Sequence, residues 1–219
     1  ILAIYKNDVE VDEINSKDEA ILILDKTPFY AESGGQVGDQ GVIESENDQF
    51  TVQDTIKIKK NVYGHIGKVK SGSFRINQKI KAQIDIERRN HIKRNHSVTH
   101  LLHKALKIVL GDHVEQKGSL VDNLKTRFDF SHTKPISNEE LNEVETIVNN
   151  EILLNKRTNT EMMAIDQAKE SGALMLFGEK YDSDVRVLTI GNSIELCGGT
   201  HVESTGDIGL FKIYSESGV

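Results

Sequence analysis

The spacing of hydrophobic residues along the chain changes its period near residue 88. Upstream of that point, residues 20–24 predict a buried strand, and residues 79–84 alternate with the period of two that is typical of a half-buried strand. Further strand-like runs lie at residues 50–53 and 56–58, and glycines punctuate the segment at positions 34, 35, 38, 41, 64, 67 and 72. Many short strands separated by glycine turns are typical of a small barrel. We therefore expect a small β-barrel over residues 1–87.

Downstream of residue 88, apolar residues recur at the spacing of an α-helix. The members of this stripe are Val98, Leu101, Leu102, Ala105, Ile108 and Val109. Gly111 provides a C-terminal stop for that helix. A second helix is predicted to begin at Ser137, because Glu140 three residues later can complete a capping box.

The rest of the downstream pattern predicts a sheet. We expect a β-hairpin over residues 118–130, strands at residues 158–165, 184–190 and 208–214, and a short helix near residues 166–171. Together with the two longer helices, these elements predict an α+β fold in which a sheet carries helices on one face. We therefore divide the chain into residues 1–87 and residues 88–219.

Composition and charge narrow the class of protein. The 219 residues are 37% apolar and 28% charged, with one cysteine and a formal net charge of −7. No apolar run approaches the roughly 20 residues that a membrane span needs, so we expect no membrane partner. One cysteine and no signal peptide predict a cytoplasmic protein. The chain has no initiator Met and ends abruptly at Val219, so we expect it to be a piece of a longer protein.

The acidic balance also bears on nucleic-acid binding. Proteins that bind many phosphates are usually basic, so this chain should bind RNA weakly when unaided. Two basic groups are local exceptions, and each is either a phosphate contact or simply a solvated face. They are Arg88, Arg89, Lys93 and Arg94, and Lys57, Lys59 and Lys60.

Two short segments carry the candidate metal chemistry. His96 and His100 are four residues apart in the first predicted helix, so both imidazoles lie on one face and can reach one ion. Cys197 and His201 have the same spacing in a glycine-rich segment. One cysteine and three histidines make a tetrahedral set that suits zinc better than calcium or magnesium.

Other interpretations of these residues weigh against the zinc site. A helix with several histidines shows this spacing by chance, and a lone cysteine is often just a small buried hydrophobe. A zinc peptidase would need a glutamate directly after the first histidine as general base, and that position holds Ser97. The sequence therefore favours a metal site but argues against a peptidase.

Longer motifs around these residues resemble a known family. Residues 94–103 and 197–202 resemble the two signatures of the editing domain of alanyl-tRNA synthetase and of its free-standing AlaX relatives. Further agreeing stretches are residues 28–39, 111–121, 127–132 and 177–181. Threonyl-tRNA synthetases carry a related domain, but the stretch at 28–39 and the form Cys197-Gly198-Gly199-Thr200-His201 favour the alanyl type.

The resemblance implies a function and its partners. It implies a β-barrel-like glycine-rich domain over residues 1–87 and a zinc-containing α+β editing core over residues 88–219. The implied activity is hydrolysis of the ester in mischarged Ser-tRNA(Ala) and Gly-tRNA(Ala). The implied partners are the tRNA(Ala) acceptor end carrying serine or glycine and the other domains of a parent synthetase. The implied zinc ligands are His96, His100, Cys197 and His201.

The resemblance also suggests substrate-binding residues. Gln116 matches a position linked to recognition of serine, and Gly34 and Gly35 match a glycine motif near the pocket. The hydroxyls of Thr99 and Ser119 could add a hydrogen bond to the substrate. Each of these residues also has a plain structural role open to it, as a turn, a solvated amide or a locally bonded hydroxyl.

The sequence leaves the mechanism and two other functions open. Four protein ligands would close the metal, whereas a loose ligand would let zinc bind and activate water. No residue is identified as the general base. The main alternative function is a non-catalytic, zinc-stabilised tRNA-binding module, and the other is a structural zinc domain.

Overall fold

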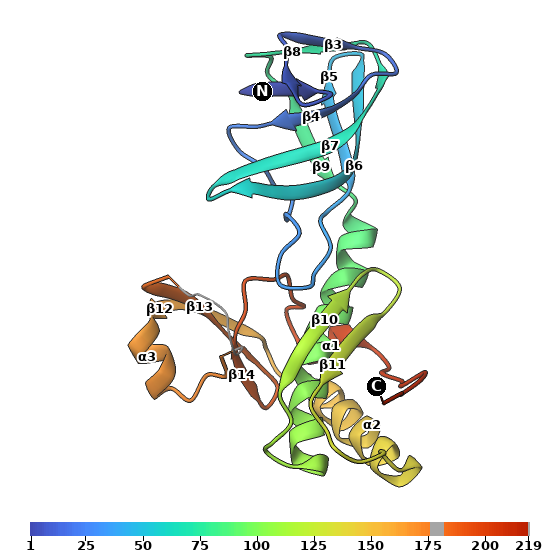
Figure 1. Ribbon diagram of the computed structural model, residues 1–219, viewed down its shortest axis with the longest axis vertical. Helices are drawn as coiled ribbons and strands as arrows, with labels where there is room; N and C mark the ends of the chain where they lie inside the picture. The colour runs from blue at the N-terminus through green and yellow to red at the C-terminus, as the bar shows by residue number, and fades with distance from the viewer. Residues whose placement is uncertain (176–181, 219) are drawn as a thin grey trace. The chain divides into compact units, whose positions relative to one another are not determined.

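The computed structural model describes residues 1–175 and 182–218, and within them the chain forms two compact units, Ile1–Arg89 and Asn90–Val219. The described residues form many strands and a smaller number of helices, so the architecture is mixed α/β (Figure 1). None of the helices in the described residues has both the length and the apolar character that a membrane crossing requires. The motif Phe177-Gly178-Glu179-Lys180-Tyr181 lies outside the described residues.

The first unit is built on one antiparallel sheet of seven strands in the order β2-β1-β4-β7-β6-β5-β9. These strands are β1 (Ala3–Lys6), β2 (Val9–Glu10), β4 (Glu19–Ile23), β5 (Gly41–Ser45), β6 (Asp48–Lys59), β7 (Val62–Ser71) and β9 (Lys81–Ile84). A separate pair joins β3 (Glu13–Asn15) to β8 (Ser73–Arg75). Strands β2 and β9 lie at the two edges, and no ladder among the described residues joins them. The small β-barrel expected from the glycine pattern is therefore not confirmed.

The irregular pairing of β6 explains why the strand-like pattern of residues 50–58 is interrupted in the sequence. The runs at residues 50–53 and 56–58 both belong to β6, which pairs with β7 along its length. The register shifts between Val52 and Asp54 and again between Lys57 and Lys59. A bulge resets the alternation of inward and outward side chains, so one long strand has the sequence pattern of two short ones.

The core of the first unit lies between the sheet and the β3–β8 pair. Phe50 and Phe74 are fully buried there, and their rings meet edge-on with centroids 6.1 Å apart. Gly67 allows β6 and β7 to approach, because a Cβ at Gly67 would lie 2.0 Å from the carbonyl oxygen of Thr51.

A glycine turn of the first unit contains two of the predicted site residues. Ser33 and Gln36 exchange backbone hydrogen bonds of 3.2 and 3.0 Å around Gly34 and Gly35. Gly34 has φ 57° and Gly35 has φ 83°, which is the left-handed region that glycine enters without a steric penalty. The structure thus supports the turn at Gly34 and Gly35 as a defined backbone feature.

The second unit is organised around α1 (Ile86–Leu110), which confirms the long predicted helix. The side chain of Asp85 accepts a hydrogen bond from Arg88 N at 2.9 Å and so caps its first turn. At the other end, Gly111 has φ 116° and donates its N–H to Lys107 O at 3.0 Å, as expected for a C-terminal stop. The capping box of α2 (Asn138–Leu153) between Ser137 and Glu140 is also confirmed.

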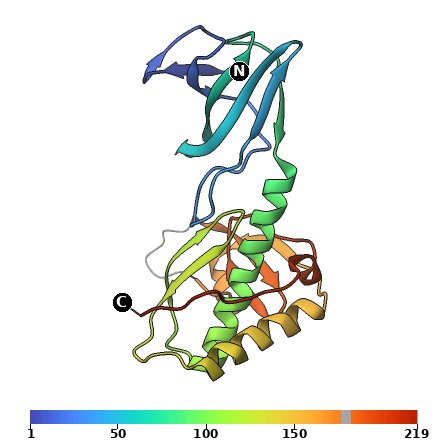
Figure 2. The same cartoon turned by 90° about the vertical axis from the view of Figure 1, so that its right-hand side faces the viewer.

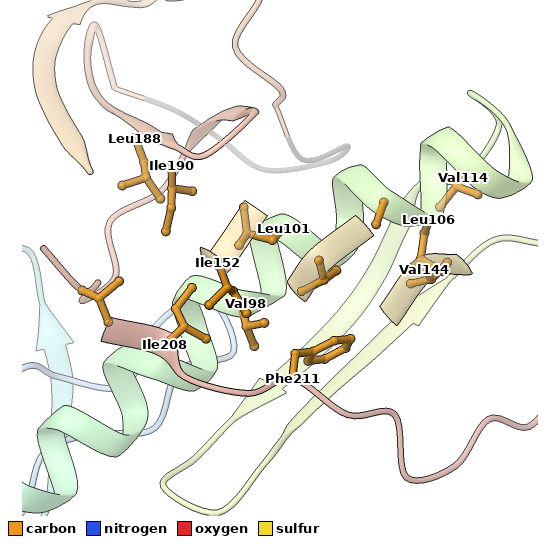
Figure 3. Packing of buried hydrophobic residues seen from close by; sticks show 13 residues of the cluster. Val98, Leu101, Leu106, Val114, Val144, Ile152, Leu188, Ile190, Ile208 and Phe211 are labelled. Atoms are coloured by element: carbon orange, nitrogen blue, oxygen red, sulfur yellow. The ribbon is translucent and has the colours of Figure 1, made fainter. Parts of the chain in front are cut away.

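The remaining elements pack beside these two helices. They are the hairpin β10 (Gln116–Val121) and β11 (Thr126–Phe130), the sheet of β12 (Asn159–Ala164), β13 (Asp184–Ile190) and β14 (Ser193–Leu196), the short α3 (Ile165–Glu170), and the 3-10 helix η1 (Thr205–Ile208). The hairpin lies along α1 in both views (Figure 2). The apolar core joins α1, α2 and β13 with residues such as Leu101, Ile152 and Leu188 (Figure 3).

The strand predicted at residues 208–214 is wrong. Residues 209–218 have no regular secondary structure. Their backbone groups bond side chains of α2, where a strand would bond the backbone of a neighbouring strand. Phe211 N donates to Asn149 Oδ1 at 2.9 Å, and Asn149 Nδ2 donates back to Phe211 O at 3.0 Å. Glu145 Oε1 accepts from Ile213 N at 2.7 Å. Phe211 and Ile213 therefore pack into the core beside α2 without forming a strand ladder.

A buried histidine makes the stability of the first unit depend on pH. His65 on β7 is fully buried, with Nδ1 at 2.9 Å from Leu22 O and Nε2 at 2.7 Å from Thr27 Oγ1. Burial lowers the pKa of His65 below its ordinary 6.5, although the bond to Leu22 O opposes this. The unfolded chain then binds more protons as the pH falls. The contribution of neutral His65 is fully present above about pH 6.5 and is lost as the pH falls below that value.

We predict that urea unfolding of this unit, followed by amide exchange in β4 and β7, will show a midpoint that falls between pH 7.5 and 5.5. In His65→Gln that fall should be smaller, because the side chain no longer titrates. The control His91→Gln, at an exposed histidine of α1, should keep the wild-type pH dependence. An unchanged pH dependence in His65→Gln would contradict the assignment.

Candidate metal centre

Four side chains from two distant segments converge in the second unit. His96 and His100 come from one face of α1, and Cys197 and His201 come from the loop after β14. Their ligand atoms all lie within 4.8 Å of one another. His100 Nε2 is 3.2 Å from His201 Nε2. Cys197 Sγ is 3.4 Å from His96 Nε2 and 3.5 Å from His201 Nε2. We call these four residues the histidine–cysteine cluster.

The fold positions the helical half of this cluster by helical geometry alone. The rings of His96 and His100 stack with centroids 5.2 Å apart and planes 18° from parallel. Both side chains are buried, with 6% of each residue exposed. Their four-residue spacing on α1 is therefore used as the sequence indicated.

Hydrogen bonds from neighbouring elements hold the loop half of the cluster in place. The guanidinium of Arg186 on β13 donates to the carbonyl oxygens of Cys197 and Gly199 at 2.9 and 2.7 Å. Ser97 on α1 is fully buried, and its Oγ accepts a hydrogen bond of 3.0 Å from Val202 N. Ser97, which replaces the glutamate of a peptidase motif, thus ties the loop to the helix.

A buried carboxylate adjoins the cluster. Glu195 on β14 is 5% exposed, and its Oε2 lies 2.8 Å from His100 Nδ1. Its Oε1 accepts a hydrogen bond of 2.7 Å from Ser193 Oγ and lies 3.6 Å from His103 Nδ1. Sequence reasoning missed Glu195. The sequence shows only that Ser193 and Glu195 share one face of a strand that leads into Cys197, and this pattern does not identify His100 as the partner of Glu195.

The charges of this site are coupled. Burial favours neutral His100, but the Glu195 carboxylate and the Cys197 sulfur outweigh it and raise the pKa of His100 to about 10. Burial opposes ionisation of Cys197, yet the neighbouring histidines, His100 foremost, lower the pKa of its thiol well below the usual value. Burial lowers the pKa of His201 to about 4. At neutral pH the cluster therefore offers a thiolate and a neutral imidazole.

This arrangement is suited to binding a cation. Thiolate sulfur and neutral imidazole nitrogen are the forms that ligate metals, and an ion would displace the proton that His100 holds. Burial removes competing water from three of the four groups, since Cys197 is half-buried and the histidines are buried. The cluster could therefore hold one metal ion.

The predicted substrate-binding residues of the second unit gather at the hairpin. Gln116 Nε2 donates a 3.1 Å hydrogen bond to Ser119 Oγ, and both residues lie on β10. Ser119 pairs across the hairpin with Phe128, whose ring lies 5.2 Å from that of His103 on α1. Directly opposed residues share a face, so Ser119 lies on the face turned toward α1.

The hydroxyl of Thr99 is less available to bind a substrate than its position on α1 suggests. Its Oγ1 donates to Asn95 O at 2.8 Å, within α1, and lies 2.9 Å from Thr126 Oγ1 of the hairpin. The hydroxyl of Thr99 therefore already orients the hairpin against the helix. Gly34 and Gly35 lie in the glycine turn of the first unit, and their role in substrate binding stays a prediction.

The four basic residues at the start of α1 make two different sets of contacts. Arg89 forms an ion pair with the buried Asp39, and Arg88 Nη1 donates to Gly38 O at 2.8 Å, so both serve the first unit. Lys93 and Arg94 line a pocket of about 290 Å³ in the second unit. Glu203 and Asp207 line the same pocket, so its charges are balanced. These basic residues are therefore not a plain phosphate-binding stripe.

We predict that Ser97→Ala lowers the free energy of unfolding of the second unit by about 1–3 kcal/mol, because the buried N–H of Val202 loses its acceptor. Urea unfolding of the metal-free protein measures this change. Thr146→Ala is the control, since the exposed Thr146 hydroxyl bonds only Asn142 O on α2. Equal small effects of the two substitutions would show that Ser97 does not hold the loop.

Comparisons with known proteins agree with the geometry of this unit. Residues 185–219, which contain Cys197 and His201, match the family described as the threonyl and alanyl tRNA synthetase second additional domain. Residues 1–88 match the family described as tRNA synthetases class II (A). The resemblance of the sequence motifs to this family is thus confirmed.

Similarity to individual relatives covers the whole chain. The chain is 59% identical over 219 residues to the alanine–tRNA ligases of Nitrosospira multiformis and Aromatoleum aromaticum, and 56% identical to that of Dechloromonas aromatica. It covers 100% of its own length but 25% of each relative, so it spans about a quarter of these proteins. Over its whole length the chain is therefore similar to one segment of alanine–tRNA ligases, and residues 185–219 match the threonyl and alanyl tRNA synthetase second additional domain.

Proposed function

We propose that this chain is an aminoacyl-tRNA deacylase that hydrolyses the ester of mischarged Ser-tRNA(Ala) and Gly-tRNA(Ala). The observation that supports this most is the convergence of the histidine–cysteine cluster beside a polar hairpin face, in a chain similar to alanine–tRNA ligases. Its partners are the acceptor end of tRNA(Ala) and the other domains of a parent synthetase.

We further propose that the metal is zinc, held by His96, His100, Cys197 and His201. Two nitrogens at tetrahedral angles on zinc lie about 3.3–3.4 Å apart, and a nitrogen and a sulfur about 3.5–3.6 Å apart, for Zn–N of about 2.0–2.1 Å and Zn–S of about 2.3 Å. The cluster has a nitrogen–nitrogen distance of 3.2 Å and nitrogen–sulfur distances of 3.4 and 3.5 Å. The donor types and their spacing both fit a tetrahedral zinc ion.

A zinc ion with four protein ligands supplies positive charge and a fixed shape to the site. The chain's own residues must then bind the amino acid and orient the ester. In the net reaction, water adds to the ester carbonyl carbon, the bond to the ribose oxygen breaks, and that oxygen takes a proton. A covalent route through Cys197 is not favoured, since three histidine nitrogens surround a site in which its sulfur serves as a ligand.

The need for such a site follows from the size of the competing amino acids. A pocket for alanine can reject glycine or serine only by about 1–3 kcal/mol, because each differs by a methyl or a hydroxyl. A second site can use the hydroxyl of serine positively. A serine hydroxyl could add a hydrogen bond to the Gln116–Ser119 pair, whereas alanine has no hydroxyl with which to do so.

We predict that Cys197→Ala loses both zinc and deacylation of Ser-tRNA(Ala), because the thiolate is a ligand. Zinc content by mass spectrometry and single-turnover release of serine measure this. Wild-type protein should spare Ala-tRNA(Ala), lose activity with a chelator and regain it with zinc. Thr146→Ala on α2 is the matched control and should keep full activity.

Three outcomes of that experiment would contradict the proposal. Full activity in Cys197→Ala would exclude the metal site. Activity that survives the chelator, together with trapping of Cys197 by iodoacetamide, would favour a cysteine nucleophile. Binding of tRNA without turnover by the wild-type chain would favour a non-catalytic tRNA-binding module.

The two substrates allow a test of serine recognition. We predict that Gln116→Ala lowers kcat/KM for Ser-tRNA(Ala) about tenfold, the value of one hydrogen bond, and changes the value for Gly-tRNA(Ala) by less than about twofold. Glycine has no hydroxyl to recognise, so it serves as the internal control. An equal loss with both esters would assign Gln116 a structural role.

A further inference from the structure

We propose that Glu195 is a positioning residue for the metal ion, because its carboxylate fixes the imidazole of His100 with Nε2 facing the other ligands. This inference rests on the proposed zinc site. Its subject is a residue outside the four ligands that reaches the ion only through His100.

The geometry selects one ring orientation and one tautomer for His100. Glu195 Oε2 lies 2.8 Å from His100 Nδ1, so a His100 ring that has lost one proton to a metal ion keeps the other on Nδ1 and donates it to the carboxylate. Nε2 of the same ring is then left with a lone pair, and it lies 3.2 Å from His201 Nε2. A histidine that donates one ring N–H to a carboxylate is a better and more rigid metal ligand through its other nitrogen.

The carboxylate of Glu195 is itself held in place. Ser193 Oγ donates to Glu195 Oε1 at 2.7 Å, and His103 Nδ1 lies 3.6 Å from the same oxygen. Ser193 is 1% exposed, and His103 is 5% exposed. The path from Ser193 through Glu195 to His100 is thus buried along its whole length, so each group has one orientation.

The charge of Glu195 is hard to explain by folding alone. A buried carboxylate is destabilising unless it is paired, and an apolar side chain of similar size often stabilises as well. Among the residues that the structure describes, the ion-pair partners of Glu195 are His100 and His103, with no lysine or arginine. A cation at the histidine–cysteine cluster would replace, through His100, the positive charge that the second proton of His100 supplies to this carboxylate.

The test compares zinc affinity in four proteins by competition with a chelator. Glu195→Gln keeps the shape and an acceptor oxygen but removes the charge, so we expect its Kd for zinc to rise 10- to 100-fold. Ser193→Ala leaves the charge but frees the carboxylate, so its Kd should rise less. Glu145→Gln is the matched control, because Glu145 is a partly buried carboxylate of α2 that bonds Lys212 Nζ and Ile213 N.

A spectroscopic readout separates positioning from general stability. With Co²⁺ in place of zinc, the visible absorption bands should shift in Glu195→Gln and stay unchanged in Glu145→Gln, even if the latter lowers the melting temperature more. Should Glu195→Gln fail to fold by circular dichroism, the Kd of Ser193→Ala decides, and a value equal to wild type would overturn the inference.

Two further outcomes are decisive and distinct. Equal zinc affinity and equal cobalt spectra in wild type and Glu195→Gln would overturn the positioning role while leaving the metal site intact. Failure of the wild-type chain to bind zinc would overturn the metal site, and the role of Glu195 with it.

Discussion

The chemistry of the second unit depends on holding four donor atoms, from segments about 100 residues apart, within contact distance of one another. Two effects destabilise such a cluster. The imidazole rings of His96, His100 and His201 lose their contact with water, and they are held close to one another and to the Cys197 sulfur. Ordinary hydrogen bonds offset part of this. Ser97 joins α1 to the loop through Val202 N, and Arg186 holds the loop carbonyls from β13. These hydrogen bonds keep the four donor atoms within 4.8 Å of one another.

Electrostatics complete this arrangement. The thiolate of Cys197 and the carboxylate of Glu195 lie on two sides of His100, which explains the raised pKa of that histidine. A divalent cation would replace the proton of His100 and neutralise both anions at once. Binding of such an ion should therefore stabilise the second unit by mass action.

How far the sequence predicts this protein can be judged residue by residue. The helical stripe around Leu101, the capping box at Ser137 and the stop at Gly111 depend on contacts within a few positions, and all three were predicted. The segment after η1 was predicted as a strand and is not one, because its partner is Asn149, a distant side chain. Strand β6 looked like two strands because its bulges reset the alternation.

In the candidate site, too, local sequence patterns identify some residues and miss those that depend on distant contacts. The cluster residues could be named from two local four-residue spacings and a family resemblance. Glu195 could not, since its role depends on a strand that brings it to His100 across 95 positions of sequence. The structure adds to the prediction for Thr99 that its hydroxyl contacts Asn95 O in α1 and Thr126 Oγ1 of the hairpin, and no sequence pattern displays these contacts.

In the proposed metal site, one ion is bound by three imidazole nitrogens and one thiolate sulfur. X-ray absorption fine structure of the zinc-loaded chain measures this directly. We expect one sulfur at about 2.3 Å and three nitrogens at about 2.0–2.1 Å around each zinc. A spectrum with no sulfur neighbour, or with only oxygen and nitrogen at the longer distances of a surface site, would contradict it.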